Sequence, residues 1–304
     1  MSAAPELEHP DRAGLISEIS RIYEIDSIST SLWLFLWFAD IERLRHLVKG
    51  ASLLPVFQEL SKRALEFHED FDSVLRLWLA RPVRVSEEES NDRRKTEPGS
   101  IPESSSSEAA TSKPQGYSRD RKLSEACIAR DEGRCQITRA GDLLEVCHIY
   151  PQDLNKRQKN DIQMRRFWAT LRIFWTQDKV EAWKDELEPN GTEILQNLIT
   201  MTRQAHGYWG NARFALFPHK PSDDGKSMDV NGKLFNCATG QKITSGTVIT
   251  LRTSDPMTHP LPSYALLQMQ WYLNRIAGLS GAAEFDNDRD EDGTFDDEID
   301  GFSD

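Results

Sequence analysis

The chain has few cysteines and no long hydrophobic run. Only four of its 304 residues are cysteine, and no two of them form a Cys-x-x-Cys pair. This excludes a disulfide-rich scaffold and a zinc ribbon built on paired cysteines. The most apolar stretch, Leu32 to Phe38, is followed by Asp40 and is far shorter than the roughly 20 residues that a bilayer span needs. We therefore expect an intracellular protein, nuclear or cytoplasmic, with reduced thiols, no secretory signal and no membrane anchor.

The chain also lacks a general excess of positive charge. Its formal net charge is −12, yet residues 284–304 contribute −10 of it, from eleven acidic residues and one arginine, which leaves −2 for the rest. Residues 119–220 hold seventeen Lys and Arg against fourteen Asp and Glu, a net charge of +3. Residues 119–220 could therefore still bind a polyanion, although the protein as a whole is acidic.

Composition divides the chain into five segments. Residues 1–85 carry apolar side chains at helical spacing and are expected to form an N-terminal helical unit. Residues 86–118 are rich in Ser, Glu, Pro and Lys, which predicts a disordered linker. Residues 119–220 are expected to form a mixed domain, residues 221–281 its strand-and-helix extension, and residues 282–304 an acidic disordered tail. The expected fold class is α+β.

Helices and short strands alternate in the predicted C-terminal half. Arg134 to Thr138 and Leu143 to His148 are extended runs around the turn residues 140–142, which predicts an antiparallel hairpin. A helix-bearing segment is predicted at 194–209. Further helices are predicted near 119–131, 161–176, 178–187 and 263–279. Further strands are predicted at 213–217, 234–235, 241–244 and 248–251.

Two histidines with an asparagine between them carry the most specific chemistry of the chain. Hydrolysis of a phosphodiester needs an oriented water, a base, and positive charge on the phosphate oxygens. A neutral imidazole suits the base because its reference pKa is about 6.5. His148 ends an extended run just before Pro151, and His206 follows Asn197 in a helix-bearing segment. A strand and a helix could therefore bring both imidazoles to one ion.

This ordered set resembles the HNH endonuclease domain of many filamentous-fungal proteins, over roughly residues 119–220. The similarity rests on Arg134-Cys135-x-x-Thr138, Glu145-x-x-His148-Ile149-x-Pro151, Asn197, His206-x-x-Trp209 and Phe214-Ala215-Leu216-x-Pro218. The resemblance implies a ββα-metal core, here with a helical insertion, and metal-dependent endonucleolytic cleavage of nucleic acid. It also implies His148 as general base, Asn197 as the amide that fixes the loop, and His206 as metal ligand.

The position before the implied base departs from the usual pattern. Metal fingers of this class place Asp or His there, whereas this chain has Cys147, whose thiolate suits zinc better than magnesium. Glu145, two residues earlier in the same strand, is a candidate substitute carboxylate. The expected cofactor is a divalent ion (Mg²⁺, Mn²⁺ or Zn²⁺) held by His206 with help from Glu145 or Cys147.

A basic stretch follows the implied base. Its members are Lys156, Arg157, Lys159, Arg165 and Arg166. They would either contact phosphates or form a solvated helix face and loop. Nucleic acid, DNA rather than RNA, is the expected partner. Two interpretations stay open: a metal-dependent endonuclease, or a catalytically weak or inactive module of the same fold that binds nucleic acid or a protein. Residues 1–85 could in addition recruit a protein partner.

Overall fold

The computed structural model describes most of the chain outside the predicted linker and tail. The described residues are 7–25, 27–53, 62, 65, 68–79, 121–155, 161–188, 190–234 and 245–282. The predicted linker, the strand at 241–244 and residues 283–304 lie outside them, as do Lys156, Arg157 and Lys159. Within the described part, none of the helices combines the length and the hydrophobicity needed to cross a membrane.

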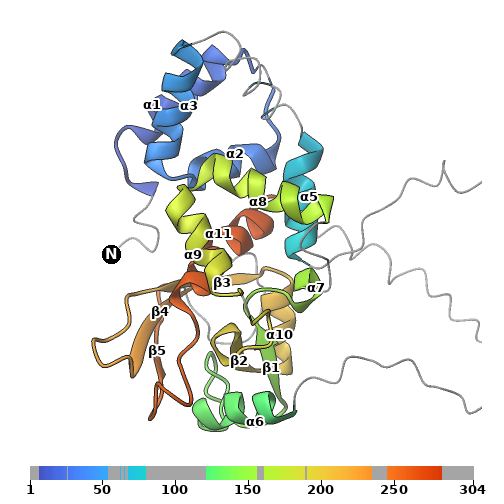
Figure 1. The fold of residues 1–304 in the computed structure, drawn as a ribbon, viewed down its shortest axis with the longest axis vertical. Coiled ribbons are helices and arrows are strands. Elements are labelled where there is room, and N and C mark those ends of the chain that lie inside the picture. The colour runs from blue at the N-terminus through green and yellow to red at the C-terminus, as the bar shows by residue number, and fades with distance from the viewer. Residues whose placement is uncertain are drawn as a thin grey trace, which may run out of the picture.

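The N-terminal part is helical (Figure 1). Its helices are α1 (Arg12–Ile22), α2 (Thr30–Phe38), α3 (Ile41–Leu53) and α5 (His68–Trp78). α2 begins after Ser29, whose hydroxyl oxygen accepts a hydrogen bond from Leu32 N at 3.2 Å and so caps the helix. α2 is apolar almost all round and is buried on most of its surface, as such a helix must be in water. The most apolar stretch of the sequence, Leu32 to Phe38, therefore lies in a helix that is largely buried.

The remaining described chain alternates helices with short strands. The elements are α6 (Arg121–Arg130), β1 (Leu144–His148), α7 (Gln152–Asn155), α8 (Ile162–Phe174), α9 (Gln177–Asp185), the 3-10 turn η3 (Leu195–Asn197), β2 (Leu198–Thr202), α10 (Arg203–Gly210), β3 (Phe214–Pro218), β4 (Ser227–Leu234), β5 (Val248–Arg252) and α11 (Tyr264–Leu279). The helices predicted near 119–131, 161–176, 178–187 and 263–279 are confirmed as α6, α8, α9 and α11. β3 and β5 confirm two predicted strands.

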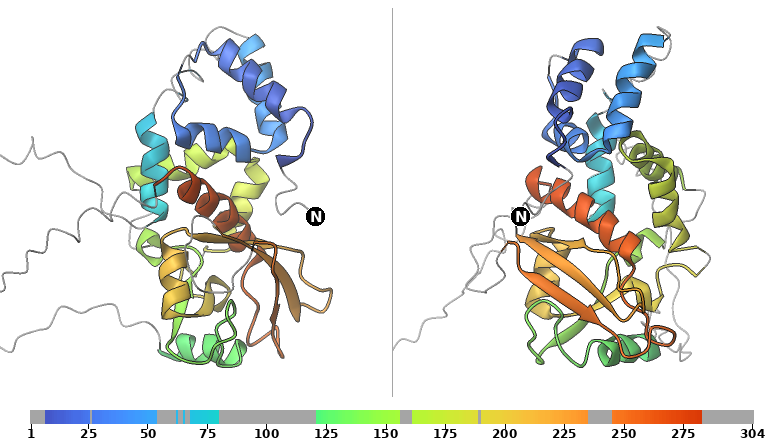
Figure 2. Two further views of the ribbon diagram at one scale, coloured as in Figure 1. Left: turned by 180° about the vertical axis from the view of Figure 1, so that it is seen from behind. Right: turned by 90° about the vertical axis from the view of Figure 1, so that its left-hand side faces the viewer.

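Two small antiparallel sheets accompany these helices. β1 pairs with β2, with His148 opposite Leu198. β3, β4 and β5 form a second sheet in that order, and α11 packs against β3 (Figure 2). The hydroxyl of Ser263 caps α11 by accepting a hydrogen bond from Leu266 N at 3.2 Å. Helices together with small antiparallel sheets make the fold α+β, which confirms the predicted class.

One hydrophobic core joins the N-terminal helices to the C-terminal half. Phe35 of α2, Phe71 of α5 and Phe174 of α8 are fully buried, with ring centroids 5.0 to 5.7 Å apart. Burying each ring contributes about 1.5–3 kcal/mol. Between α5 and α11, Trp78 Nε1 donates a hydrogen bond to Asn274 Oδ1 at 2.7 Å. The helices on the two sides of the predicted linker therefore share one core.

The predicted hairpin of 134–138 with 143–148 is wrong. Residues 134–138 form a turn, in which Cys135 N donates to Ala140 O at 2.8 Å and Thr138 N to Cys135 Sγ at 3.3 Å. β1 pairs instead with β2, which lies in the segment 194–209 that was predicted as helix-bearing. That segment holds η3, β2 and α10 in succession. β4 and α7 were not predicted either, apart from the last residue of β4.

Candidate active site

β1, β2 and α10 place the two histidines close together. His148 is the last residue of β1, and His206 lies in α10, which begins directly after β2. Thr202 is the last residue of β2, and its hydroxyl caps α10 by accepting a hydrogen bond from Ala205 N at 3.3 Å. Because β1 and β2 run side by side, α10 returns along β1, and His206 reaches Glu145 of that strand.

Both imidazoles line one cleft with a volume of about 220 Å³. The other lining residues are Trp78, Leu79, Ile149, Pro151, Gln152, Asp153, Trp209, Gly210 and Asn274. The His148 side chain is only 9 % exposed, whereas that of His206 is 32 % exposed. A reactant must therefore enter the cleft to reach His148, while His206 is also accessible from solvent.

The His148 ring is held by a carboxylate that the sequence analysis did not identify. His148 Nε2 lies 2.8 Å from Glu193 Oε1, and the same oxygen accepts a hydrogen bond from Gln152 Nε2 at 3.0 Å. Trp209 Nε1 donates to the His148 backbone carbonyl at 3.3 Å. Glu193 follows no motif in the sequence, so nothing there distinguished it from the other acidic residues of the insertion.

Glu145 connects His206 to an arginine. Glu145 Oε2 lies 2.7 Å from His206 Nδ1, and Oε1 accepts from Arg203 Nε at 2.9 Å. The hydrogen bond from His206 first, and that from Arg203 second, lower the pKa of Glu145 below its ordinary value. The Glu145 carboxylate is therefore charged at neutral pH. It remains partly exposed, with 28 % of its side chain accessible.

Asn197 fixes the chain immediately after His148. The Asn197 side chain is fully buried. Its Oδ1 accepts from Tyr150 N at 2.7 Å, and its Nδ2 donates to the carbonyls of Tyr150 and Thr192 at 3.1 and 3.0 Å. Ile149 N donates to the Asn197 backbone carbonyl at 2.8 Å. Backbone groups that would otherwise be buried without partners are thereby satisfied, and the end of β1 is tied to η3.

Cys147 lies apart from the cleft. Its side chain is fully buried within the hydrophobic core, and Cys147 Sγ donates a long hydrogen bond of 3.8 Å to the Glu145 backbone carbonyl. Of the predicted basic residues, Arg165 and Arg166 are exposed on α8. Across the described ranges, no three His, Cys, Asp or Glu side chains gather as ligands of one ion.

A buried ion pair behind β2 fixes that strand. Arg130 Nε lies 2.9 Å from Asp131 Oδ1, with side chains 0 % and 4 % exposed. Arg130 also donates to Leu198 O at 2.7 Å, and Asp131 Oδ2 accepts from Thr200 N at 2.8 Å. Burial raises the pKa of the neighbouring Cys127 to about 12, so this thiol stays protonated. The pair therefore anchors one strand of the histidine site from inside.

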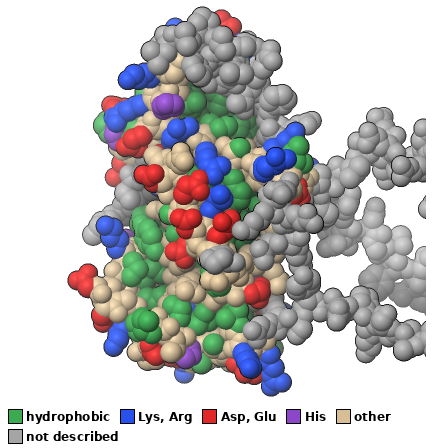
Figure 3. Space-filling view, viewed as in Figure 1, with side chains coloured by type: hydrophobic (Ala, Val, Ile, Leu, Met, Phe, Trp, Pro, Cys, Tyr) green, Lys and Arg blue, Asp and Glu red, His purple; other side chains and the backbone are tan. Residues whose placement is uncertain are grey.

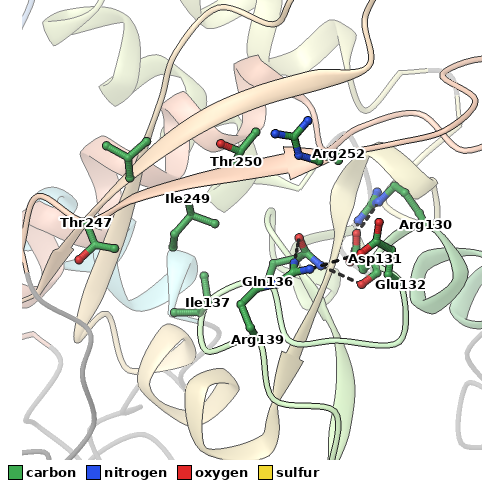
Figure 4. A pocket seen from close by; sticks show the side chains of 11 residues that line it. Arg130, Asp131, Glu132, Gln136, Ile137, Arg139, Thr247, Ile249, Thr250 and Arg252 are labelled. Atoms are coloured by element: carbon green, nitrogen blue, oxygen red, sulfur yellow. Dashed lines mark hydrogen bonds and ion pairs between the residues drawn. The ribbon is translucent and has the colours of Figure 1, made fainter.

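A larger cleft, of about 390 Å³, lies between the loop at 131–139 and β5 (Figure 4). Its lining includes Gln136, Arg139 and Arg252. Neither histidine lines it, and neither does any other residue predicted for the site. Size alone therefore does not distinguish the cleft that holds the two histidines.

Comparison with known protein families identifies the class of domain that contains the two histidines. Residues 135–216 match a family model described as HNH endonuclease. The match begins at the Cys135 turn and ends within β3, so it includes β1, β2 and α10. These residues therefore form an HNH-type domain within a longer chain, of a family that cleaves or binds nucleic acid and generally uses a divalent metal ion. The filamentous-fungal subtype stays a prediction. No curated protein and no solved structure matches the chain.

Proposed function

We propose that the protein is a metal-dependent endonuclease that hydrolyses phosphodiester bonds of nucleic acid in the histidine cleft. The observation that carries this proposal is that His148 and His206, far apart in the sequence, line the same cleft. Each imidazole also contacts a different carboxylate, Glu193 for His148 and Glu145 for His206. Two histidines in different surroundings can take two different roles.

His148 is the proposed general base. The Glu193 carboxylate accepts a hydrogen bond from His148 Nε2 and so orients the imidazole for proton transfer from water. The Glu193 carboxylate would then stabilise the imidazolium that forms, as an acidic partner does in other base-assisted hydrolases. Asn197 supports this role indirectly, because it fixes the backbone at 149–150.

Glu145 and His206 are the proposed metal ligands. They fit a divalent ion because a charged carboxylate and an imidazole adjoin in a partly exposed position, where an ion could replace the proton that His206 Nδ1 donates to Glu145 Oε2. Oxygen and nitrogen donors suit Mg²⁺, Mn²⁺ or Zn²⁺, and the buried thiol of Cys147 stays outside the set. When bound, the ion would neutralise charge on the phosphate oxygens.

DNA is the proposed substrate, and its phosphates are the proposed partners of the basic stretch. Arg165 and Arg166 are exposed, and Lys156, Arg157 and Lys159 precede them in the sequence. On the face seen in Figure 3, basic and acidic side chains are intermixed over the middle of the molecule. We therefore expect few phosphate contacts and a correspondingly shallow dependence of affinity on salt.

The test is nicking of a supercoiled plasmid by the full chain with Mg²⁺, Mn²⁺ or Zn²⁺. The wild type should nick the plasmid, a chelator should stop it, and His148→Ala should be inactive. His46→Ala is the matched control, because His46 is an exposed histidine of α3 and should leave nicking unchanged. Equal nicking by His148→Ala would overturn the proposed base. Metal-independent binding without nicking would favour the non-catalytic module.

A further inference from the structure

A helix from the N-terminal part forms one wall of the histidine cleft. Trp78 ends α5 and Leu79 follows it, and both line the cleft together with His148 and His206. Asn274 of α11 lines it as well. All three wall residues lie outside the matched range 135–216. The wall is therefore contributed by parts of this chain outside the residues that match the HNH family model.

Hydrogen bonds fix this wall in place. Trp78 Nε1 donates to Asn274 Oδ1 at 2.7 Å, while Asn274 Nδ2 donates to the carbonyls of Trp209 and Phe214 at 3.3 and 3.1 Å. Asn274 thus ties α5 to the end of α10, which carries His206. Trp78 is only 3 % exposed and meets the Tyr150 ring edge-on at 6.0 Å. Moving the wall would leave buried polar groups unpaired, at about 1–3 kcal/mol each.

The space between the wall and the histidines is small. Its volume of about 220 Å³ is below the roughly 300–1,000 Å³ of pockets that enclose a drug-sized ligand. A cleft of this size can admit a phosphate group. Since little of His148 is exposed outside the cleft, the scissile phosphate must enter this space.

We infer that the site acts on unpaired nucleic acid, including the transiently unpaired segments of a supercoiled plasmid, and excludes a relaxed, intact duplex. This inference rests on the proposed hydrolytic function. In a duplex each phosphate is tied to stacked base pairs on a stiff helix, with a persistence length of about 50 nm. α5 cannot move aside to admit a duplex, because its cleft-lining end at Trp78 is packed into the core. A single strand can bend its backbone and splay its bases. One of its phosphates can therefore enter the cleft while the bases stay outside.

The test compares one DNA oligonucleotide, alone and annealed to its complement, as substrate of the full chain with Mn²⁺. The single strand should be cut at least tenfold faster than the duplex. Leu79→Ala shortens a wall residue without touching the Trp78–Asn274 hydrogen bond, so it should raise duplex cleavage relative to single-strand cleavage. Arg76→Ala, a change on α5 outside the cleft lining, is the control and should leave the ratio unchanged.

Failure of this inference and failure of the proposed function give different results. Equal cutting of duplex and single strand by the wild type would overturn the inference and leave the hydrolytic function standing. An unchanged ratio in a folded Leu79→Ala variant would overturn the role of the wall. If neither substrate is cut, the proposed function fails. In that case, fluorescence anisotropy measures the affinity of the protein for the single strand and for the duplex. Equal affinity for both forms would overturn the inference.

Discussion

His148 Nε2 and Glu193 Oε1 lie 2.8 Å apart although 45 residues separate them in the chain. The intervening residues hold α7, α8 and α9, the helical insertion between β1 and β2. Gln152 of α7 donates to the same Glu193 oxygen, so the insertion supplies a partner for the carboxylate as well as the carboxylate itself. The insertion therefore completes the histidine site, besides lengthening the connection between the two strands.

Glu193→Gln should reduce the rate of nicking about tenfold to a hundredfold, the usual cost of losing a partner that orients a catalytic group. The amide keeps a hydrogen-bonding group of similar size but no longer stabilises the imidazolium. The acid limb of the pH–rate profile should therefore move to lower pH, a change that lost packing alone would not produce. Asp185→Asn, an exposed acidic residue of α9, should change neither rate nor profile. An unmoved acid limb would contradict a role for Glu193 at His148.

Divalent metal affinity should depend on His206 and Glu145. His206→Ala and Glu145→Gln each remove one of the two donors that meet at 2.7 Å. Each should weaken Mn²⁺ binding at least tenfold, as measured by isothermal titration calorimetry, while His46→Ala should leave it unchanged.

The Cys147→Ala variant tests whether Glu145 or Cys147 binds the metal ion together with His206. Because the thiol is buried in the core, this change should lower stability by about 1 kcal/mol and leave Mn²⁺ and Zn²⁺ affinity within twofold of the wild type. A folded Cys147→Ala protein that no longer binds Zn²⁺ would instead make Cys147 a ligand.

Asn197→Ala should lower the free energy of unfolding by about 2–4 kcal/mol. The change leaves buried backbone groups of Tyr150 and Thr192 without partners, each of which carries a desolvation penalty. Urea unfolding followed by tryptophan fluorescence measures the loss. Asn211→Ala, which removes one exposed hydrogen bond to the Gly207 carbonyl, should cost less than about 0.5 kcal/mol. Similar losses for the two variants would argue against a special role of Asn197 in the loop.

The sequence predicted the parts of this fold that depend on local patterns. Helix α11 was predictable because its apolar residues recur at helical spacing behind a capping residue, Ser263. β2 was not, because the strand is only five residues long and its partners are distant in sequence. Thr200 bonds Asp131 through its backbone N–H and Gln136 through its carbonyl. Such pairings depend on tertiary packing, which the spacing of residues along the sequence does not predict.

The site was predictable to the same extent. His148, Asn197 and His206 stand in recognisable local motifs, and the fold brings both histidines to one cleft. The burial of Cys147 could not be foreseen, because alternation along a strand tells which residues share a face but not which face is covered. Trp78 reaches the cleft only because α5 packs on α11. The sequence pattern of residues 1–85 gives no indication of that contact.

The contact of Glu145 with His206 and Arg203 should make stability depend on pH in the acidic range. Because the pKa of Glu145 is lowered on folding from its ordinary value of 4.5, the carboxylate stabilises the native state above that value. The contribution is lost as pH falls through the lower native pKa. Since the group is partly exposed, it is worth at most about 1 kcal/mol, or roughly 1–3 °C in Tm.

Glu145→Gln should therefore melt at a lower temperature than the wild type at pH 5.5, and the two curves should converge as pH falls toward 3. Differential scanning fluorimetry across this range measures the difference. Glu125→Gln, which breaks an exposed pair with Arg121 on α6, should shift Tm by less than a degree at any pH. A difference between wild type and Glu145→Gln that grows on acidification would mean that the carboxylate destabilises the native state and is not stabilised by its contacts with His206 and Arg203.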